Sequence, residues 1–98
     1  MKILLDTHVW LWLNLEPSRL PPSFANAIGA PENEIMVSVA SIWEVSIKHR
    51  LGKLDVPGPF QAFVDDALRE IQVLGIDRFH VERLHTLPLL RVDVSPCG

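Results

Sequence analysis

Two acidic residues of this chain adjoin apolar segments, where a carboxylate needs a partner. Asp6 directly follows the apolar run ILL (3–5), and Glu44 lies within the stretch VASIWEVSIKHR (39–50). On a helix of 3.6 residues per turn, Glu44 shares a face with four apolar residues, namely Ala40, Trp43, Ile47 and Leu51. An ionised carboxylate in apolar surroundings is costly unless a counter-charge compensates it. A divalent cation shared by the two acids is one such partner.

Two such acids would support metal-dependent chemistry on phosphates. Mg²⁺ is usually held by one or two carboxylates and engages substrate phosphates, and a divalent ion can activate water for attack on a phosphodiester. Asp6 and Glu44 are therefore the candidate metal ligands and the candidate catalytic residues. Thr7, Ser38 and Ser41 are hydroxyl residues that could orient waters or a carboxylate.

Purely structural interpretations of both acids remain open from the residues alone. Asp is among the best helix N-caps, so Asp6 could simply cap a helix that begins at the next residue, although a capping carboxylate still has a second oxygen. Glu44 could pair with Lys48 at i+4. It could also close a capping box with Ser41 if the helix began at residue 42, but Ser38 is an equally good cap for a longer helix.

The elements that must position these residues alternate along the chain. Apolar runs predict strands over 2–5, 35–39 and 71–76, and periodicity and capping signals predict helices over 7–14, 22–30, 40–51, 60–70 and 78–85. This alternation predicts an α/β domain with a parallel sheet, in which ligands bind at the carboxyl ends of the strands. If the first two strands are neighbours, Asp6 and Glu44 converge at that edge.

Length and composition predict one soluble domain over residues 1–98. Hydrophobic residues make up 48% of the chain and charged residues 21%, and the net charge of −3 argues against binding nucleic acid by bulk electrostatics. Cys97 is the single cysteine, so no internal disulfide is expected. We expect neither a signal peptide nor a membrane span, and we therefore expect the protein in the cytoplasm.

Two long motifs resemble the PIN-domain ribonuclease toxins of VapBC-type toxin–antitoxin systems. They are MKILLDTHVWLW (1–12), with Asp-Thr-His after the first strand, and VSVASIWEVSIKHRLGKL (37–54), with the pattern S-x-x-S-x-W-E-x-x-I-K. Asn-Glu at 33–34 and Leu-Pro-Leu at 87–89 also fit, so the likeness covers residues 1–90.

The resemblance implies a PIN-like, doubly wound α/β fold and an endoribonuclease that uses Mg²⁺ or Mn²⁺. It further implies a cognate antitoxin as partner and RNA as substrate, and a second copy of the chain is another candidate partner. Asp6 and Glu44 match the family's first two acidic site residues. A local basic patch, formed by Lys48, His49, Arg50 and Lys53, could contact RNA, but an ordinary solvated helix end explains it equally well.

The likeness fails after Leu90, where the family continues with D-P-F-D-R, a helix and another strand. Residues 91–98 (RVDVSPCG) do not match, and 89–98 show too little pattern to predict an element. Asp93 falls near the first Asp of that motif, and the third and fourth site acids have no counterpart. We therefore expect a fold that is incomplete at its C-terminus, through a frameshift, a premature stop or a truncated gene model.

Such a shortened chain would expose the edge of its first strand, which favours aggregation or recruitment of another chain. It would also bind metal weakly and have strongly reduced activity. An inactive remnant that still binds antitoxin is the alternative function. A third interpretation is an unrelated α/β scaffold in which Asp6 is only a cap and Glu44 only an ion-pair partner.

Overall fold

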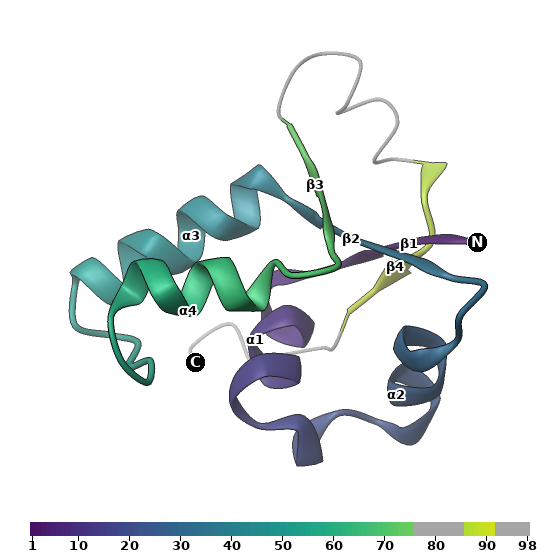
Figure 1. The fold of residues 1–98 in the computed structure, drawn as a ribbon, viewed down its shortest axis with the longest axis horizontal. Coiled ribbons are helices and arrows are strands. Elements are labelled where there is room, and N and C mark those ends of the chain that lie inside the picture. The colour runs from purple at the N-terminus through teal and green to yellow at the C-terminus, as the bar shows by residue number, and fades with distance from the viewer. Residues whose placement is uncertain (76–85, 92–98) are drawn as a thin grey trace.

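The computed structural model describes residues 1–75 and 86–91, and a four-stranded parallel sheet forms its centre. The strand order is β3-β2-β1-β4, so β1 lies between β2 and β4 (Figure 1). The strands are β1 (Lys2–Leu5), β2 (Glu34–Ser38), β3 (Gln72–Leu74) and β4 (Leu89–Leu90). The predicted α/β fold with a parallel sheet is confirmed. The reversal of strand order on passing from β3 to β4 is the topology of a doubly wound sheet.

Helices fill the connections between β1, β2 and β3. They are α1 (Thr7–Leu15), the 3₁₀ turn η1 (Pro17–Arg19), α2 (Pro22–Gly29), α3 (Val39–Arg50) and α4 (Phe60–Ala67). The helix predicted over 60–70 ends three residues earlier, and Glu70 adopts a positive φ of 63° just before the sheet resumes. The helix predicted over 78–85 lies outside the described residues.

Alternating side chains of the strands build two apolar layers of unequal size. Ile3, Leu5 and Val37 belong to the main core, which α1, α3 and α4 complete, and α2 packs against it. Leu4 and Met36 point to the opposite face and belong to a smaller cluster. The period-two alternation of the strands thus divides the apolar residues between a thick layer and a thin one.

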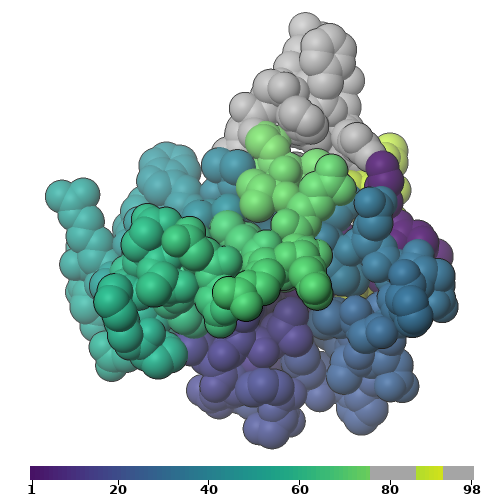
Figure 2. All heavy atoms as spheres, in the orientation of Figure 1, coloured from purple at the N-terminus to yellow at the C-terminus, as the bar shows by residue number. Residues whose placement is uncertain are grey.

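Trp10 connects α1 to the helix that covers it. Its side chain is fully buried, and its indole Nε1–H donates a hydrogen bond to the carbonyl oxygen of Ala67 at 3.1 Å. Because Ala67 is the last residue of α4, this bond satisfies a carbonyl that has no partner within its helix. Figure 2 shows α4 and the segment after it at the front of the molecule, with α1 largely behind them.

The expectation of a bare edge on β1 is wrong for the described residues. β4 pairs with β1 in parallel, and two backbone hydrogen bonds of 3.0 Å join them, from Leu4 N–H to Pro88 O and from Asp6 N–H to Leu90 O. A two-residue strand has no alternation for a sequence pattern to detect. Pro88 takes part through its carbonyl, so its missing N–H costs nothing in this pairing.

None of the helices in the described part of the chain is long and apolar enough to cross a membrane. The longest of them, α3, has 12 residues.

Candidate metal and active site

The carboxyl ends of β1 and β2 lie side by side and lead directly into helices. Leu5 is in register with Val37, so the next residues, Asp6 and Ser38, lie beside each other where the two strands end. Neighbouring strands are about 4.8 Å apart. Asp6 is the N-cap of α1 and Ser38 the N-cap of α3. Strand order reverses between β1 and β4, and such a switch point opens the crevice in which α/β sheets bind ligands.

Asp6 is fixed at this switch point through both its backbone and its side chain. Its N–H bonds to Leu90 on β4, and its Oδ1 accepts a hydrogen bond of 2.9 Å from the N–H of Val9. The predicted cap is therefore present. Among the described residues, no hydrogen bond or ion pair engages the second oxygen, Oδ2. The half-buried carboxylate thus combines a structural role with a free oxygen.

Glu44 lies on the exposed side of α3, and the prediction that it is embedded in a buried apolar stripe is wrong. Trp43 is 65% exposed and Ile47 is 42% exposed, so the whole stripe faces outward. The helix packs on the core through Ser41 and Val45 instead. Glu44 therefore pays no burial cost, and its Oε1 forms the anticipated i,i+4 ion pair with Lys48 Nζ at 3.6 Å.

The capping-box interpretation of Glu44 is also wrong. The helix begins at Val39, and Ser38 Oγ accepts a hydrogen bond of 3.0 Å from the N–H of Ala40. The helix therefore starts before Ser41, which leaves the Ser41 hydroxyl free for another partner.

A buried contact between α1 and α3 brings the neighbourhoods of the two acids together. The Thr7 hydroxyl donates a hydrogen bond of 2.9 Å to the Ser41 hydroxyl. Thr7 follows Asp6 directly, and Ser41 precedes Glu44 by three residues, a spacing that places Cβ atoms about 5–6 Å apart on a helix. The acids thus flank one contact between two helices. That they share a single ion remains a prediction.

The chemistry of these side chains suits a hard cation. Asp6 and Glu44 offer carboxylate oxygens, the ligand type that Mg²⁺ prefers, and Mg²⁺ usually retains several waters besides one or two carboxylates. No cluster of three or more His, Cys, Asp or Glu side chains suited to a metal occurs within residues 1–75 and 86–91. A cation shared by Asp6 and Glu44 would therefore have no third ligand of these types from the described residues. Asp93 lies outside them.

The predicted basic patch is smaller than its four residues suggest. Lys48 is paired with Glu44, and the His49 ring stacks on Phe60, with centroids 4.5 Å apart and an interplanar angle of 24°. Arg50 and Lys53 are exposed. These two cations are the members of the patch best placed to meet a phosphate backbone.

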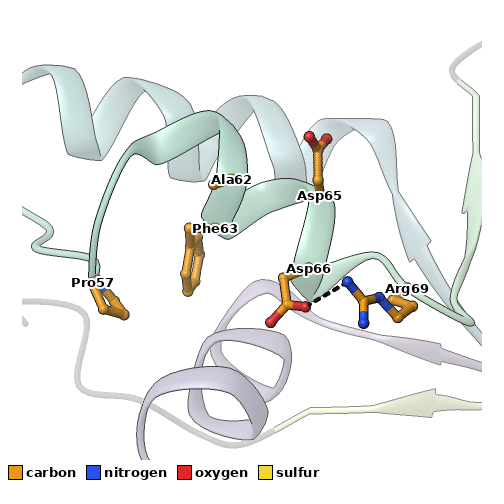
Figure 3. Close-up of a pocket in the computed structure, with 6 residues that line it drawn as sticks. All are labelled: Pro57, Ala62, Phe63, Asp65, Asp66 and Arg69. Atoms are coloured by element: carbon orange, nitrogen blue, oxygen red, sulfur yellow. Dashed lines mark ion pairs between the residues drawn. The ribbon is translucent and has the colours of Figure 1, made fainter.

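Two hollows on the surface of the described residues are lined by neither acid. One is lined by residues of α4 and its flanks: Pro57, Ala62, Phe63, Asp65, Asp66 and Arg69 (Figure 3). In it Asp66 Oδ1 pairs with Arg69 at 3.2 Å, while Asp65 points away from that pair. A second hollow is lined by Leu13, Ile28, Ile35, Arg69, Glu70 and Ile71. Neither lining includes Asp6 or Glu44.

Comparison with known proteins agrees with this geometry. The PIN domain family matches residues 3–94, which extends past Leu90 and includes Asp93. The chain therefore belongs to the PIN domain family. It is similar to Ribonuclease VapC16 of Mycobacterium tuberculosis (strain ATCC 25618 / H37Rv), with 31% identity over 91 residues. That alignment covers 84% of this chain and 64% of the relative, so the chain spans under two thirds of the relative's length. No solved structure matches the chain.

Proposed function

We propose that this protein is the toxin of a VapBC-type toxin–antitoxin system, a divalent-metal-dependent endoribonuclease that hydrolyses RNA phosphodiester bonds. The observation that carries this proposal is Asp6, held at the switch point with one carboxylate oxygen that no hydrogen bond or ion pair engages within residues 1–75 and 86–91. Glu44 stands one helical turn beyond the contact that joins α3 to α1. Similarity to a protein named a ribonuclease supports the reaction class.

Asp6 and Glu44 have different roles in this proposal. Asp6 would hold the cation through Oδ2, because the Val9 N–H fixes Oδ1 and thereby the orientation of the carboxylate. Glu44 would bind the ion directly or through water. It would then give up its exposed ion pair with Lys48, because a divalent cation attracts the carboxylate more strongly than one ammonium group does. When bound, Mg²⁺ or Mn²⁺ supplies charge stabilisation and lowers the pKa of water at the scissile phosphate.

RNA would reach the site through local contacts, because the chain as a whole carries a net charge of −3. Arg50 and Lys53 are the exposed cations at the end of the helix that carries Glu44. We propose the cytoplasm as the location, as the presence of RNA requires.

We propose two protein partners on separate surfaces. An antitoxin peptide with apolar side chains would fit the two hollows, which share Arg69 and offer both apolar walls and charges. A second copy of the chain would cover the exposed apolar stripe on α3, in which Trp43 and Leu51 are 65% and 63% exposed.

Cleavage of RNA by the purified chain tests the proposal. We expect hydrolysis with Mn²⁺ or Mg²⁺ that is slow, because few protein ligands hold the ion, and no hydrolysis with EDTA. Asp6→Asn and Glu44→Gln should lower that rate at least ~100-fold. Asp55→Asn and Glu32→Gln are matched controls, since both acids are exposed and lie away from the carboxyl ends of β1 and β2. Cleavage that survives Asp6→Asn would contradict the assignment. Antitoxin binding without cleavage in the wild type would instead identify an inactive binding module.

A further inference from the structure

The hydrogen bond between Thr7 and Ser41 differs in kind from the other side-chain contacts. It joins two hydroxyls, each in the first turns of its helix, and the two residues are only 8% and 9% exposed. In the described part of the chain it is the one buried hydrogen bond that joins two side chains, because the bond between Gln61 and Asp65 is exposed.

Helix packing alone does not call for hydroxyls at this contact. The neighbouring positions Val9 and Val45 are fully buried and apolar. An apolar pair of similar shape would pack here without any need for hydrogen-bond partners, whereas each buried hydroxyl must be satisfied. The hydroxyl pair instead makes the contact directional, because a hydrogen bond fixes the angle and the register between the two helices.

Among the described residues, the side chain of each acid is otherwise held only within its own helix. Asp6 is oriented by Val9 on α1, and Glu44 is paired with Lys48 on α3. These contacts fix neither acid relative to the other. The bond between Thr7 and Ser41 does so across the helix interface, at the residue next to Asp6 and one turn before Glu44.

We propose that Thr7 and Ser41 are positioning residues, a hydroxyl pair whose hydrogen bond across the helix interface holds the two carboxylates at one metal site. This inference rests on the proposed function, because it presupposes that Asp6 and Glu44 bind the same ion.

Mn²⁺ binding, measured by calorimetry without RNA, tests the pair together with thermal unfolding in EDTA. The variants are Thr7→Val, Ser41→Ala, the double variant and Thr7→Ser, with the exposed Ser23→Ala on α2 as control. Thr7→Val leaves the buried Ser41 hydroxyl unpaired and should lower Tm, and the double variant should recover part of that loss. Mn²⁺ affinity should nevertheless fall about tenfold in both single removals and in the double variant, as when a group that orients a metal ligand is removed. Thr7→Ser should restore it, and Ser23→Ala should leave it unchanged.

A double variant that binds Mn²⁺ as tightly as the wild type would overturn the inference, because the pair would then serve packing alone. The proposed function would survive that result if Asp6→Asn still abolished binding. A wild-type chain whose Mn²⁺ binding is absent, or insensitive to Asp6→Asn, would overturn the metal site itself and the positioning role with it.

Discussion

Replacing Asp6 in two ways separates its structural role from its proposed catalytic one. Asn keeps a side-chain oxygen that can accept the hydrogen bond from Val9 N–H, whereas Ala keeps none. Both remove the negative charge that a cation requires. We therefore expect Asp6→Asn and Asp6→Ala to lose Mn²⁺ binding alike and to differ in stability.

The size of the stability difference follows from the cap. Loss of an N-cap side chain costs about 1 kcal/mol, and in a domain of about 100 residues this corresponds to a Tm lower by about 4–8 °C. Asp6→Asn should therefore unfold close to the wild-type temperature when both are measured in EDTA. The backbone bond from Asp6 to Leu90 is common to all three proteins and cancels in the comparison.

Calorimetric unfolding in EDTA and Mn²⁺ titration of the folded proteins provide the two readouts. Mn²⁺ should raise the Tm of the wild type and leave that of both variants unchanged, since a ligand stabilises only the state that binds it. Equal Tm values for Asp6→Asn and Asp6→Ala would refute the capping role. A Tm rise with Mn²⁺ in Asp6→Asn equal to that of the wild type would refute the role in metal binding.

Three further predictions concern neighbouring contacts. Lys48→Met should bind Mn²⁺ about twofold more tightly in calorimetry, because the ion pair between Lys48 and Glu44 competes with the metal ion and contributes only ~0.3–0.5 kcal/mol. Weaker binding would show that Lys48 supports the site. Trp10→Phe should lower the free energy of unfolding in urea by about 2–3 kcal/mol, through the lost bond to Ala67 and a cavity beside it, and a loss below ~1 kcal/mol would contradict this account. Trp43→Ser should weaken self-association at least ~tenfold in analytical ultracentrifugation, and an unchanged dimer would exclude the α3 stripe as its interface.

Much of the fold was predictable because its strands and helices carry strong local signals. The runs at 2–5 and 35–39 are apolar enough to predict the central strands, although the second strand ends at Ser38 and Val39 already begins α3. Ser38 and Asp6 were recognisable as caps. β4 was not predictable, because two residues have no periodicity and their pairing depends on β1 at the other end of the described chain.

The site was predictable only in part, for a physical reason that α3 illustrates. Periodicity identified an apolar stripe around Glu44 correctly, but it does not say whether a stripe meets the core or solvent. The tertiary packing turned Ser41 and Val45 inward instead. The hydrogen bond between Thr7 and Ser41 was not predictable either. The sequence indicated that both hydroxyls could orient waters or a carboxylate, but a contact between residues 34 positions apart depends on the completed sheet.

The bond from the Asp6 amide to Leu90 has a consequence for the order of folding. The N-cap residue of α1 donates its backbone hydrogen bond to the last strand of the described sheet, so closing that contact requires one of the longest loops the chain can form. Local structure around Asp6 can therefore form early, while its final placement waits for Leu90. Hydrogen exchange during refolding should show the Asp6 amide gaining protection later than the amides within α3, whose partners are only four residues away.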